Sequence, residues 1–264
     1  MIKIGIDVGS TTAKLVAVDE NDNLLFSKYE RHNAKAKETI LSFLKELLSE
    51  IGDKDISVRI TGSIGMGISE KCSLPFVQEV VAAAKAIQKD YSHVTSMIDI
   101  GGEDAKVVFF NDAEATDLRM NGNCAGGTGA FIDQMAIILG VNIDELNQLA
   151  MNATQVYPIA SRCGVFCKTD IQNLIAKNVS RENIAASIFR AVAVQTVVTL
   201  AHGCDITTPV LFCGGPLTFI PALRKAFIDY LSLDEKEIIL PANGTLLPAL
   251  GAALFHLDKE DYCK

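Results

Sequence analysis

Apolar and polar positions in the first third of the chain predict a compact α/β unit. The residues up to Ala17 form two apolar runs separated by a Gly-Ser-Thr-Thr turn, which predicts two strands, and Leu24 to Tyr29 predicts a third. From Lys35 to Ile51 apolar residues recur every three or four positions, as on one face of an amphipathic helix. The pattern continues with a strand at Val58–Thr61, a glycine-rich loop at Gly62–Gly67 and a helix at Glu79–Lys89.

The pattern then restarts. An apolar strand from Ser96 ends in Asp99, a glycine turn follows, and strands are predicted at Ala105–Phe110 and Ala115–Met120. The opening of the chain has the same order, an apolar strand ending in aspartate, a small-residue turn and a strand that begins near a lysine. Lys14 and Lys106 occupy similar places, and an internal duplication is predicted.

The rest of the chain alternates between helical and strand patterns. Ser180 is a predicted N-cap of a long helix. The predicted helices are residues 126–139, 163–177, 181–201, 220–231 and 246–256, and the predicted strands are 209–213 and 238–240. No linker or low-complexity segment interrupts them. The predicted fold class is therefore α/β in two similar halves.

Composition narrows the class of protein. The 264 residues are 49% hydrophobic and 21% charged, which supplies a core and excludes a disordered chain. A net charge of -8 argues against binding nucleic acid or an anionic membrane. Neither a signal peptide nor a membrane-length apolar run is found, so a cytoplasmic location is expected. In that compartment the seven cysteines favour burial, a metal or redox chemistry over disulfides.

The first small-residue turn has the chemistry of a phosphate site. Backbone N–H groups and hydroxyls there can bind a phosphate, because small residues allow close approach. Asp7 at the strand end is a candidate ligand of hydrated Mg²⁺, and Lys14 can neutralise phosphate charge. An ordinary hairpin in which Asp7 only accepts hydrogen bonds is the alternative. The candidate phosphate-binding residues of this turn are Gly9, Ser10, Thr11, Thr12 and Lys14.

Two further turns follow buried strands. Asp99 precedes Gly101 and Gly102, and Cys213 precedes Gly214, Gly215 and Pro216. Three such turns are what a nucleotide held between two lobes requires. The chain has no G-x-x-x-x-G-K-[ST] loop and no G-x-G-x-x-G followed by a helix, which argues against P-loop and Rossmann folds.

These turns resemble the phosphate-1, phosphate-2 and adenosine motifs of the acetate and sugar kinase, Hsc70 and actin superfamily. The resemblance implies two RNase H-like (actin-like ATPase) lobes with the nucleotide, ATP or ADP, in the cleft between them. The first lobe is expected to comprise residues 1–95 and 246–264, and the second residues 96–245. Asp7, Asp99 and Glu103 are the implied catalytic residues, with Asp7 and Asp99 holding Mg²⁺ through water.

Two cysteine-bearing segments narrow the resemblance. Residues 121–129 and 161–166 are similar to motifs of the activator (archerase) branch, ATPases that energise 2-hydroxyacyl-CoA dehydratases and benzoyl-CoA reductases. The resemblance implies that Cys124 and Cys163 bind one [4Fe-4S] cluster per homodimer, because two cysteines per chain cannot complete four thiolates. It also implies a ferredoxin or flavodoxin as electron donor and a client dehydratase or reductase.

Ligation of a cluster is not the only interpretation of the cysteines. Cys124 and Cys163 precede predicted helices, whose N-termini stabilise negative charge, but small buried core cysteines are the competing interpretation. Cys167 lies four residues after Cys163 on the same helical face, and either ligation or simple proximity is open. For Cys72, Cys204, Cys213 and Cys263, burial or a surface thiol is preferred.

One residue departs from the family pattern. Glu103 stands where stand-alone activators carry glutamine; it can orient or deprotonate the attacking water, repel the γ-phosphate, or pair with a lysine. The sequences at Arg119–Gly122 and around Cys163 are more similar to long fused activator-like proteins than to stand-alone ones. The chain can therefore also be one module of a longer polypeptide or a short relative of such proteins. Two other functions compete, a small-molecule (amino-sugar) kinase and a non-redox, partner-binding ATPase.

Overall fold

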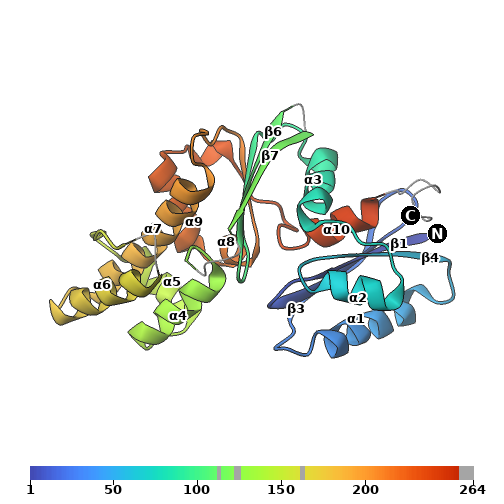
Figure 1. Cartoon of the computed structure of the whole chain (residues 1–264), viewed down its shortest axis with the longest axis horizontal. Coiled ribbons are helices and arrows are strands. Elements are labelled where there is room, and N and C mark those ends of the chain that lie inside the picture. The colour runs from blue at the N-terminus through green and yellow to red at the C-terminus, as the bar shows by residue number, and fades with distance from the viewer. Residues whose placement is uncertain (112–113, 122–125, 161–163, 256–264) are drawn as a thin grey trace. The chain divides into compact units, whose positions relative to one another are not determined.

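The computed structural model describes residues 1–111, 114–121, 126–160 and 164–255. The chain divides into two compact units (Figure 1). The first comprises Met1–His93, Asp112–Glu114 and Thr245–Lys264, and the second comprises Val94–Asn111 and Ala115–Gly244. Each unit contains one sheet, and the C-terminal helix packs in the first unit with the N-terminal strand.

The first unit is a four-stranded sheet with helices on both faces. Its strand order is β3-β2-β1-β4, with β2 antiparallel to β1 and β3, and β4 parallel to β1. The strands are β1 (Ile2–Val8), β2 (Thr12–Val18), β3 (Leu24–Arg31) and β4 (Ile56–Thr61). The helices are α1 (Ala36–Ile51), α2 (Gly65–Cys72), α3 (Glu79–Asp90) and α10 (Leu247–Leu254).

Alternation along β2 explains why both faces of this sheet are covered. Leu15 and Ala17 lie in one apolar cluster with the buried stripe of α1, whereas Val16 and Val18 lie in another cluster with α10. Successive strand residues point to opposite faces, so the continuous apolar run Leu15–Val18 has to be covered on both sides. Figure 1 shows α10 beside α3, although about 160 residues of sequence separate them.

The second unit is a five-stranded sheet in the order β7-β6-β5-β8-β9. Its strands are β5 (Ser96–Ile100), β6 (Ala105–Asn111), β7 (Glu114–Asn121), β8 (Val210–Cys213) and β9 (Ile238–Ile239). Its helices are α4 (Gly129–Leu139), α5 (Ile143–Met151), α6 (Gly164–Ala176), α7 (Arg181–Leu200), α8 (Gly215–Phe219) and α9 (Pro221–Leu231), with a short 3-10 turn at Glu235–Glu237.

Helix α7 is the centre of this unit. Eleven of its residues are buried, and the eight apolar ones among them join the core together with residues from the sheet and from α4, α6 and α9. Among the described residues it is the one helix with the length and apolarity to cross a membrane, and 61% of its most apolar window is buried inside the protein. Its apolar surface is therefore already used by the core of the second unit.

The two sheets repeat one arrangement, as the restarting pattern predicted. β5 is antiparallel to β6 and parallel to β8, just as β1 is antiparallel to β2 and parallel to β4. Asp7 lies opposite Lys14 across the first pair, and Asp99 lies opposite Lys106 across the second. The mixed α/β prediction is confirmed.

Local predictions were wrong at three places. Residues 65–67 belong to α2 and not to a loop, because Gly65 packs against Ile60, where an added side chain would come within 2.9 Å of the Ile60 side chain. Helix α5 was not predicted, although Asn142 and Glu145 form a capping box that marks its start. Helix α8 was read as part of a glycine turn.

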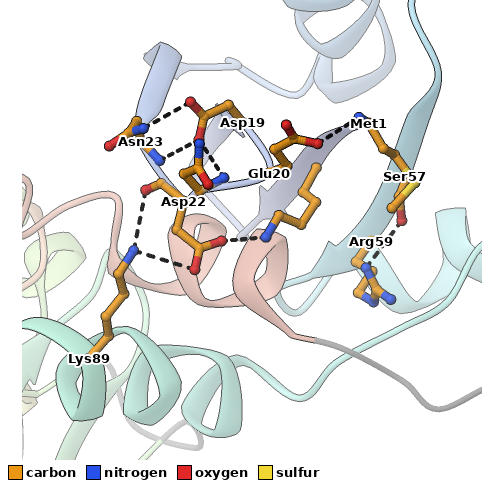
Figure 2. A network of polar contacts seen from close by, with 10 residues as sticks. Met1, Asp19, Glu20, Asp22, Asn23, Ser57, Arg59 and Lys89 are labelled. Carbon is orange, nitrogen blue, oxygen red and sulfur yellow. Dashed lines mark hydrogen bonds and ion pairs between the residues drawn. The ribbon is translucent and has the colours of Figure 1, made fainter.

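A polar network holds the β2–β3 turn to the rest of the first unit (Figure 2). Asp19 accepts hydrogen bonds from the backbone of Asn21 and Asn23, and the carboxylate of Asp22 pairs with the amines of Lys3 and Lys89. Because Lys3 lies near the start of β1 and Asp7 lies near its end, this network is at the opposite end of the strand from the first phosphate turn. Its ion pairs link the β2–β3 turn to β1 and α3.

Candidate functional site: two Asp–Lys turns

The first turn is closed by backbone hydrogen bonds. Gly9 N donates to Thr12 O at 3.0 Å, which bends the chain sharply between β1 and β2. The turn leaves Ser10, Thr11 and Thr12 partly exposed, and their hydroxyls form no hydrogen bond with any residue in the described part of the chain. A methyl group added at Gly9 would meet only ordinary contacts, at 3.6 Å or more. A small side chain at this position would therefore contact Thr12 O and Lys14 Nζ without a clash.

The charge of this turn is a buried ion pair. Lys14 Nζ lies 2.8 Å from Asp7 Oδ2, with the Asp7 side chain fully buried and that of Lys14 13% exposed. Burial on its own lowers the pKa of Lys14, but attraction to Asp7, a hydrogen bond to that carboxylate and the more distant Glu79 outweigh it, so its pKa is raised. Lys14 is consequently a partly accessible cation paired with a fully buried carboxylate.

A third strand approaches Asp7 closely. Gly62, directly after β4, has a φ of +92°, and a Cβ at this position would lie 2.4 Å from Asp7 Oδ1. Only glycine fits there, because both the left-handed backbone and the contact exclude a side chain. Asp7 Oδ1 has no hydrogen-bond partner among the residues that the structure describes.

The second turn repeats the backbone hydrogen bond and the Asp–Lys pair of the first. Gly101 N donates to Asp104 O at 2.9 Å, the equivalent of the bond from Gly9 to Thr12. Lys106 Nζ lies 2.7 Å from Asp104 Oδ2 and 3.8 Å from Asp99 Oδ2. Lys106 is thus shared by two carboxylates, with its side chain 3% exposed and that of Asp99 10% exposed.

Gly214 is the counterpart of Gly62. Its φ is +81°, and a Cβ there would lie 2.4 Å from Asp99 Oδ1 and 2.1 Å from Ile100 O. Gly129, the first residue of α4, is also closely packed but less severely, since an added Cβ would lie 3.2 Å from both Gly101 O and Pro216 Cγ. The second unit therefore brings the predicted turns at Asp99–Gly102 and Gly214–Pro216 together at the start of α4.

These features fit phosphate and a divalent cation. Carboxylate oxygens are the ligands that Mg²⁺ prefers, and Asp7 Oδ1 is a buried carboxylate oxygen without a hydrogen-bond partner among the described residues. Asp99 is the more accessible of the two carboxylates. The hydroxyls of Ser10, Thr11 and Thr12, which have no partner among the described residues, lie in the same turn as Gly9 and near the charge of Lys14, and this combination suits a phosphate group.

Glu103 is exposed, and it forms no ion pair within the described residues. The lysine of this turn pairs with Asp104, which the sequence analysis did not assign to the site, and with Asp99. Pairing with a lysine is one of the alternatives predicted for Glu103, and no such pair occurs among the described residues. A role toward water or phosphate stays a prediction.

Cys124 and Cys163 lie outside the described residues, so their predicted ligation stays a prediction. Helices α4 and α6 begin shortly after them in sequence, contact each other and both contact α7. Among the described residues, no group of three or more His, Cys, Asp or Glu side chains is placed to hold a metal. Cys167 is buried in the core, and burial followed by the nearby Asp170 raises its pKa to about 12.

Each of the two sheets carries one Asp–Lys turn, and this duplicated arrangement is typical of the actin-like ATPase fold. The protein is therefore of the actin-like ATPase class. Residues 4–256 match the BadF/BadG/BcrA/BcrD ATPase family. The 2-hydroxyisocaproyl-CoA dehydratase activator of Clostridioides difficile is 30% identical over 98% of this chain and 96% of its own length. The chain therefore belongs to the BadF/BadG/BcrA/BcrD ATPase family.

Two solved structures are similar over the whole chain. Component A of (R)-2-hydroxyglutaryl-CoA dehydratase from Acidaminococcus fermentans superposes with a TM-score of 0.86 at 27% identity, covering 100% of both chains. The activator of 2-hydroxyisocaproyl-CoA dehydratase from Clostridium difficile, solved with bound ADPNP, gives a TM-score of 0.83 at 29% identity, covering 96% of this chain and 93% of that chain.

Sequence reasoning missed Gly62, Gly129, Asp104 and His32 as parts of the site. The duplication held a signal for Gly62, because a Thr-Gly pair after β4 corresponds to the Cys-Gly pair after β8. His32 and Gly129 approach the turns only through the fold, since each lies more than twenty residues away along the chain.

Proposed function

We propose that this protein is an ATP-hydrolysing activator that passes a low-potential electron to a client 2-hydroxyacyl-CoA dehydratase or benzoyl-CoA reductase. The observation that carries the proposal is the duplicated Asp–Lys turn, in a chain that is similar to activators of such dehydratases. A ferredoxin or flavodoxin loses one electron, and the client gains it. The proposal rests on family membership for the electron transfer and on geometry for the nucleotide.

The first turn is proposed to bind the phosphate chain of ATP or ADP. Ser10, Thr11 and Thr12 supply hydroxyls, Gly9 supplies space, and Lys14 supplies positive charge. Lys14 keeps its charge at neutral pH, since Asp7 raises its pKa. Pre-organised charge of this kind stabilises phosphoryl transfer because little covalent chemistry is needed from the protein.

The second turn is proposed to hold the metal and the attacking water. Asp99 and Asp7 would bind Mg²⁺ through water, and the ion would neutralise charge on the phosphates. Glu103 is exposed beside Gly101 and Gly102, where it can orient or deprotonate a water molecule. Gly214, Gly215 and Pro216 would complete the nucleotide site of this unit.

Cys124 and Cys163 are proposed to hold a [4Fe-4S] cluster shared between two copies of the chain. The cluster would supply one-electron redox chemistry. Coupling requires that ATP and ADP bind with different affinity to two conformations of the protein, because a ligand shifts an equilibrium only through such a difference.

Anaerobic purification followed by iron and sulfide analysis tests this function. The expected result is about four iron and four sulfide per two chains, with electron transfer to a dehydratase that depends on ATP. Cys124→Ala and Cys163→Ala should each lose both iron and transfer. Cys72→Ala is the matched control, because Cys72 is an exposed thiol on α2, and it should keep both.

An iron-free protein whose Cys124→Ala variant keeps full activity would contradict electron transfer. Phosphorylation of an amino sugar by that protein would indicate the kinase alternative. ATP-dependent association with a partner, without iron, would indicate a non-redox switch.

A further inference from the structure

His32 contacts the first phosphate turn at two points. Its ring Nε2 lies 3.0 Å from Gly9 O, and its backbone N donates to Thr11 O at 3.2 Å. The side chain is buried, with 4% of the residue exposed. We infer that His32 is a positioning residue that directs the Ser10 N–H toward the phosphate chain of the nucleotide. The inference deepens the proposed function, because it rests on ATP binding at this turn.

Peptide geometry connects His32 to Ser10. In a planar trans peptide, the C=O of one residue and the N–H of the next point in opposite directions. A carbonyl oxygen can only accept, so the Nε2 of His32 carries the proton, an assignment that follows from its partner. Holding Gly9 O on the imidazole therefore turns the Ser10 N–H away from His32. Within the described residues that N–H has no partner, and Ser10 is partly exposed.

The second turn shows the same carbonyl anchored by a different donor. Gly101 is the equivalent of Gly9, and Gly101 O accepts from Gly129 N at 2.9 Å. Gly129 opens α4, so a backbone N–H at a helix start performs there what the imidazole performs in the first turn. Anchoring this carbonyl is thus common to both repeats, although the donor differs. A requirement of the turn explains that recurrence better than packing does.

The local backbone favours this interpretation over a purely structural role. His32 is followed by Asn33 and Ala34, with φ of 47° and 63°, and left-handed backbone costs about 1–2 kcal/mol per non-glycine residue. His32 Nδ1 is buried without a hydrogen-bond partner in the described part of the chain, which is also unfavourable. The hydrogen bond to Gly9 offsets the cost of burying this imidazole.

Two substitutions separate the Nε2 contact from the rest of the ring. Glutamine places its amide nitrogen near the position of Nε2, whereas asparagine reaches only to the position of Nδ1. In isothermal titration with MgATP, His32→Asn should weaken binding about tenfold or more, the effect of one hydrogen bond to a charged group. His32→Gln should stay within about twofold of wild type. His93→Asn is the control, because His93 is exposed.

Titration with adenosine as a second ligand distinguishes a loss of phosphate positioning from a general loss of the nucleotide site. The affinity for adenosine should be unchanged in His32→Asn, because adenosine has no phosphate for the Ser10 N–H to meet. An equal loss of adenosine and ATP binding, or no loss of ATP binding in a folded His32→Asn protein, would overturn the inference. If His32→Asn does not fold, a His32→Gln protein that folds but binds ATP tenfold more weakly would overturn it equally. Failure of the wild-type protein to bind ATP would contradict the proposed function itself.

Discussion

At the scale of residues, the two Asp–Lys pairs differ in which partner meets solvent. In the first turn the carboxylate is fully buried and Lys14 is 13% exposed, whereas in the second the lysine is 3% exposed and Asp99 10%. Lys106 is held by two carboxylates, and Lys14 by one. Lys14 is therefore the more accessible of the two lysines, and Lys106 is held by more carboxylates within its turn.

Removal of the Lys14 charge should destabilise the protein and weaken ATP binding. Lys14→Met leaves Asp7 as a buried charge without its counter-ion, and breaking such pairs costs about 3–5 kcal/mol. Denaturant unfolding measures this loss. Lys28→Met is the control, because Lys28 pairs with Glu46 at the surface, and it should hardly move the unfolding midpoint.

The stability due to Lys14 should depend on pH in one direction. A lysine whose folded pKa is raised binds its proton more tightly in the folded state, so its contribution is fully present below the ordinary lysine pKa of 10.5. The contribution is lost as pH rises through the folded pKa. The difference in unfolding free energy between wild type and Lys14→Met should be constant near pH 9 and shrink above about pH 10.5. A constant difference at all pH values would contradict the ion pair.

Gly214 offers a comparison with a glycine of identical φ. Gly214 and Gly203 both have a φ of +81°, but an added Cβ at Gly203 meets no atom within 4 Å, whereas at Gly214 it meets Asp99 and Ile100. Gly203→Ala should cost about 1–2 kcal/mol from the backbone alone. Gly214→Ala should cost about 1–3 kcal/mol more and should also weaken ATP binding. Equal unfolding midpoints for the two variants would show that Asp99 is not packed against this turn.

At the scale of elements, the packing of α10 depends on glycines that let its backbone contact the backbone of α3 and β1. A Cβ on Gly251 would lie 1.6 Å from Ala82 O in α3, and one on Gly5 in β1 would lie 1.9 Å from Ala249 O. Small residues on all three elements thus let the C-terminal helix lie against both α3 and the first sheet. The burial of α10 by elements from the beginning of the chain ties both ends of the sequence into the first unit.

Gly251→Ala should therefore lower the unfolding midpoint sharply, because backbone on both sides of the contact would have to move. Gly67 in α2 provides the matched substitution. It is also helical, it is exposed, and an added Cβ there meets nothing within 4 Å. Gly67→Ala should leave stability unchanged or raise it by about 1 kcal/mol, because alanine has the higher helix propensity. Similar losses in both variants would argue against close packing of α10.

At the scale of the whole molecule, the two units are built on one plan. Each places an aspartate at the end of its central strand, a lysine opposite on the antiparallel neighbour, and a left-handed glycine after the parallel neighbour. The second unit adds one strand and a larger set of helices around α7. The family relationship and the ADPNP-bound structural relative agree with a nucleotide-binding role for that plan.

The sequence by itself determined the features that depend on neighbouring residues. Short apolar runs bounded by turn residues defined β1, β2 and β5, and helical spacing defined α1 and α7, because these patterns follow local backbone geometry. The Asp-x-Gly-Ser-Thr-Thr and Asp-x-Gly-Gly turns were likewise readable, since phosphate chemistry needs particular residues at close spacing. The short helices α2 and α8 were not, because glycine and proline oppose helix formation until packing offsets them.

Only the tertiary structure decided which distant residues meet the turns. Gly62 and Gly214 fit against Asp7 and Asp99 because parallel strands end side by side, a contact that no local pattern contains. The imidazole of His32 and the first N–H of α4 hold equivalent carbonyls, although their residue types have nothing in common. Local sequence determines the chemistry that a turn offers, and the fold determines which groups orient it, because orientation depends on contacts between segments far apart in the chain.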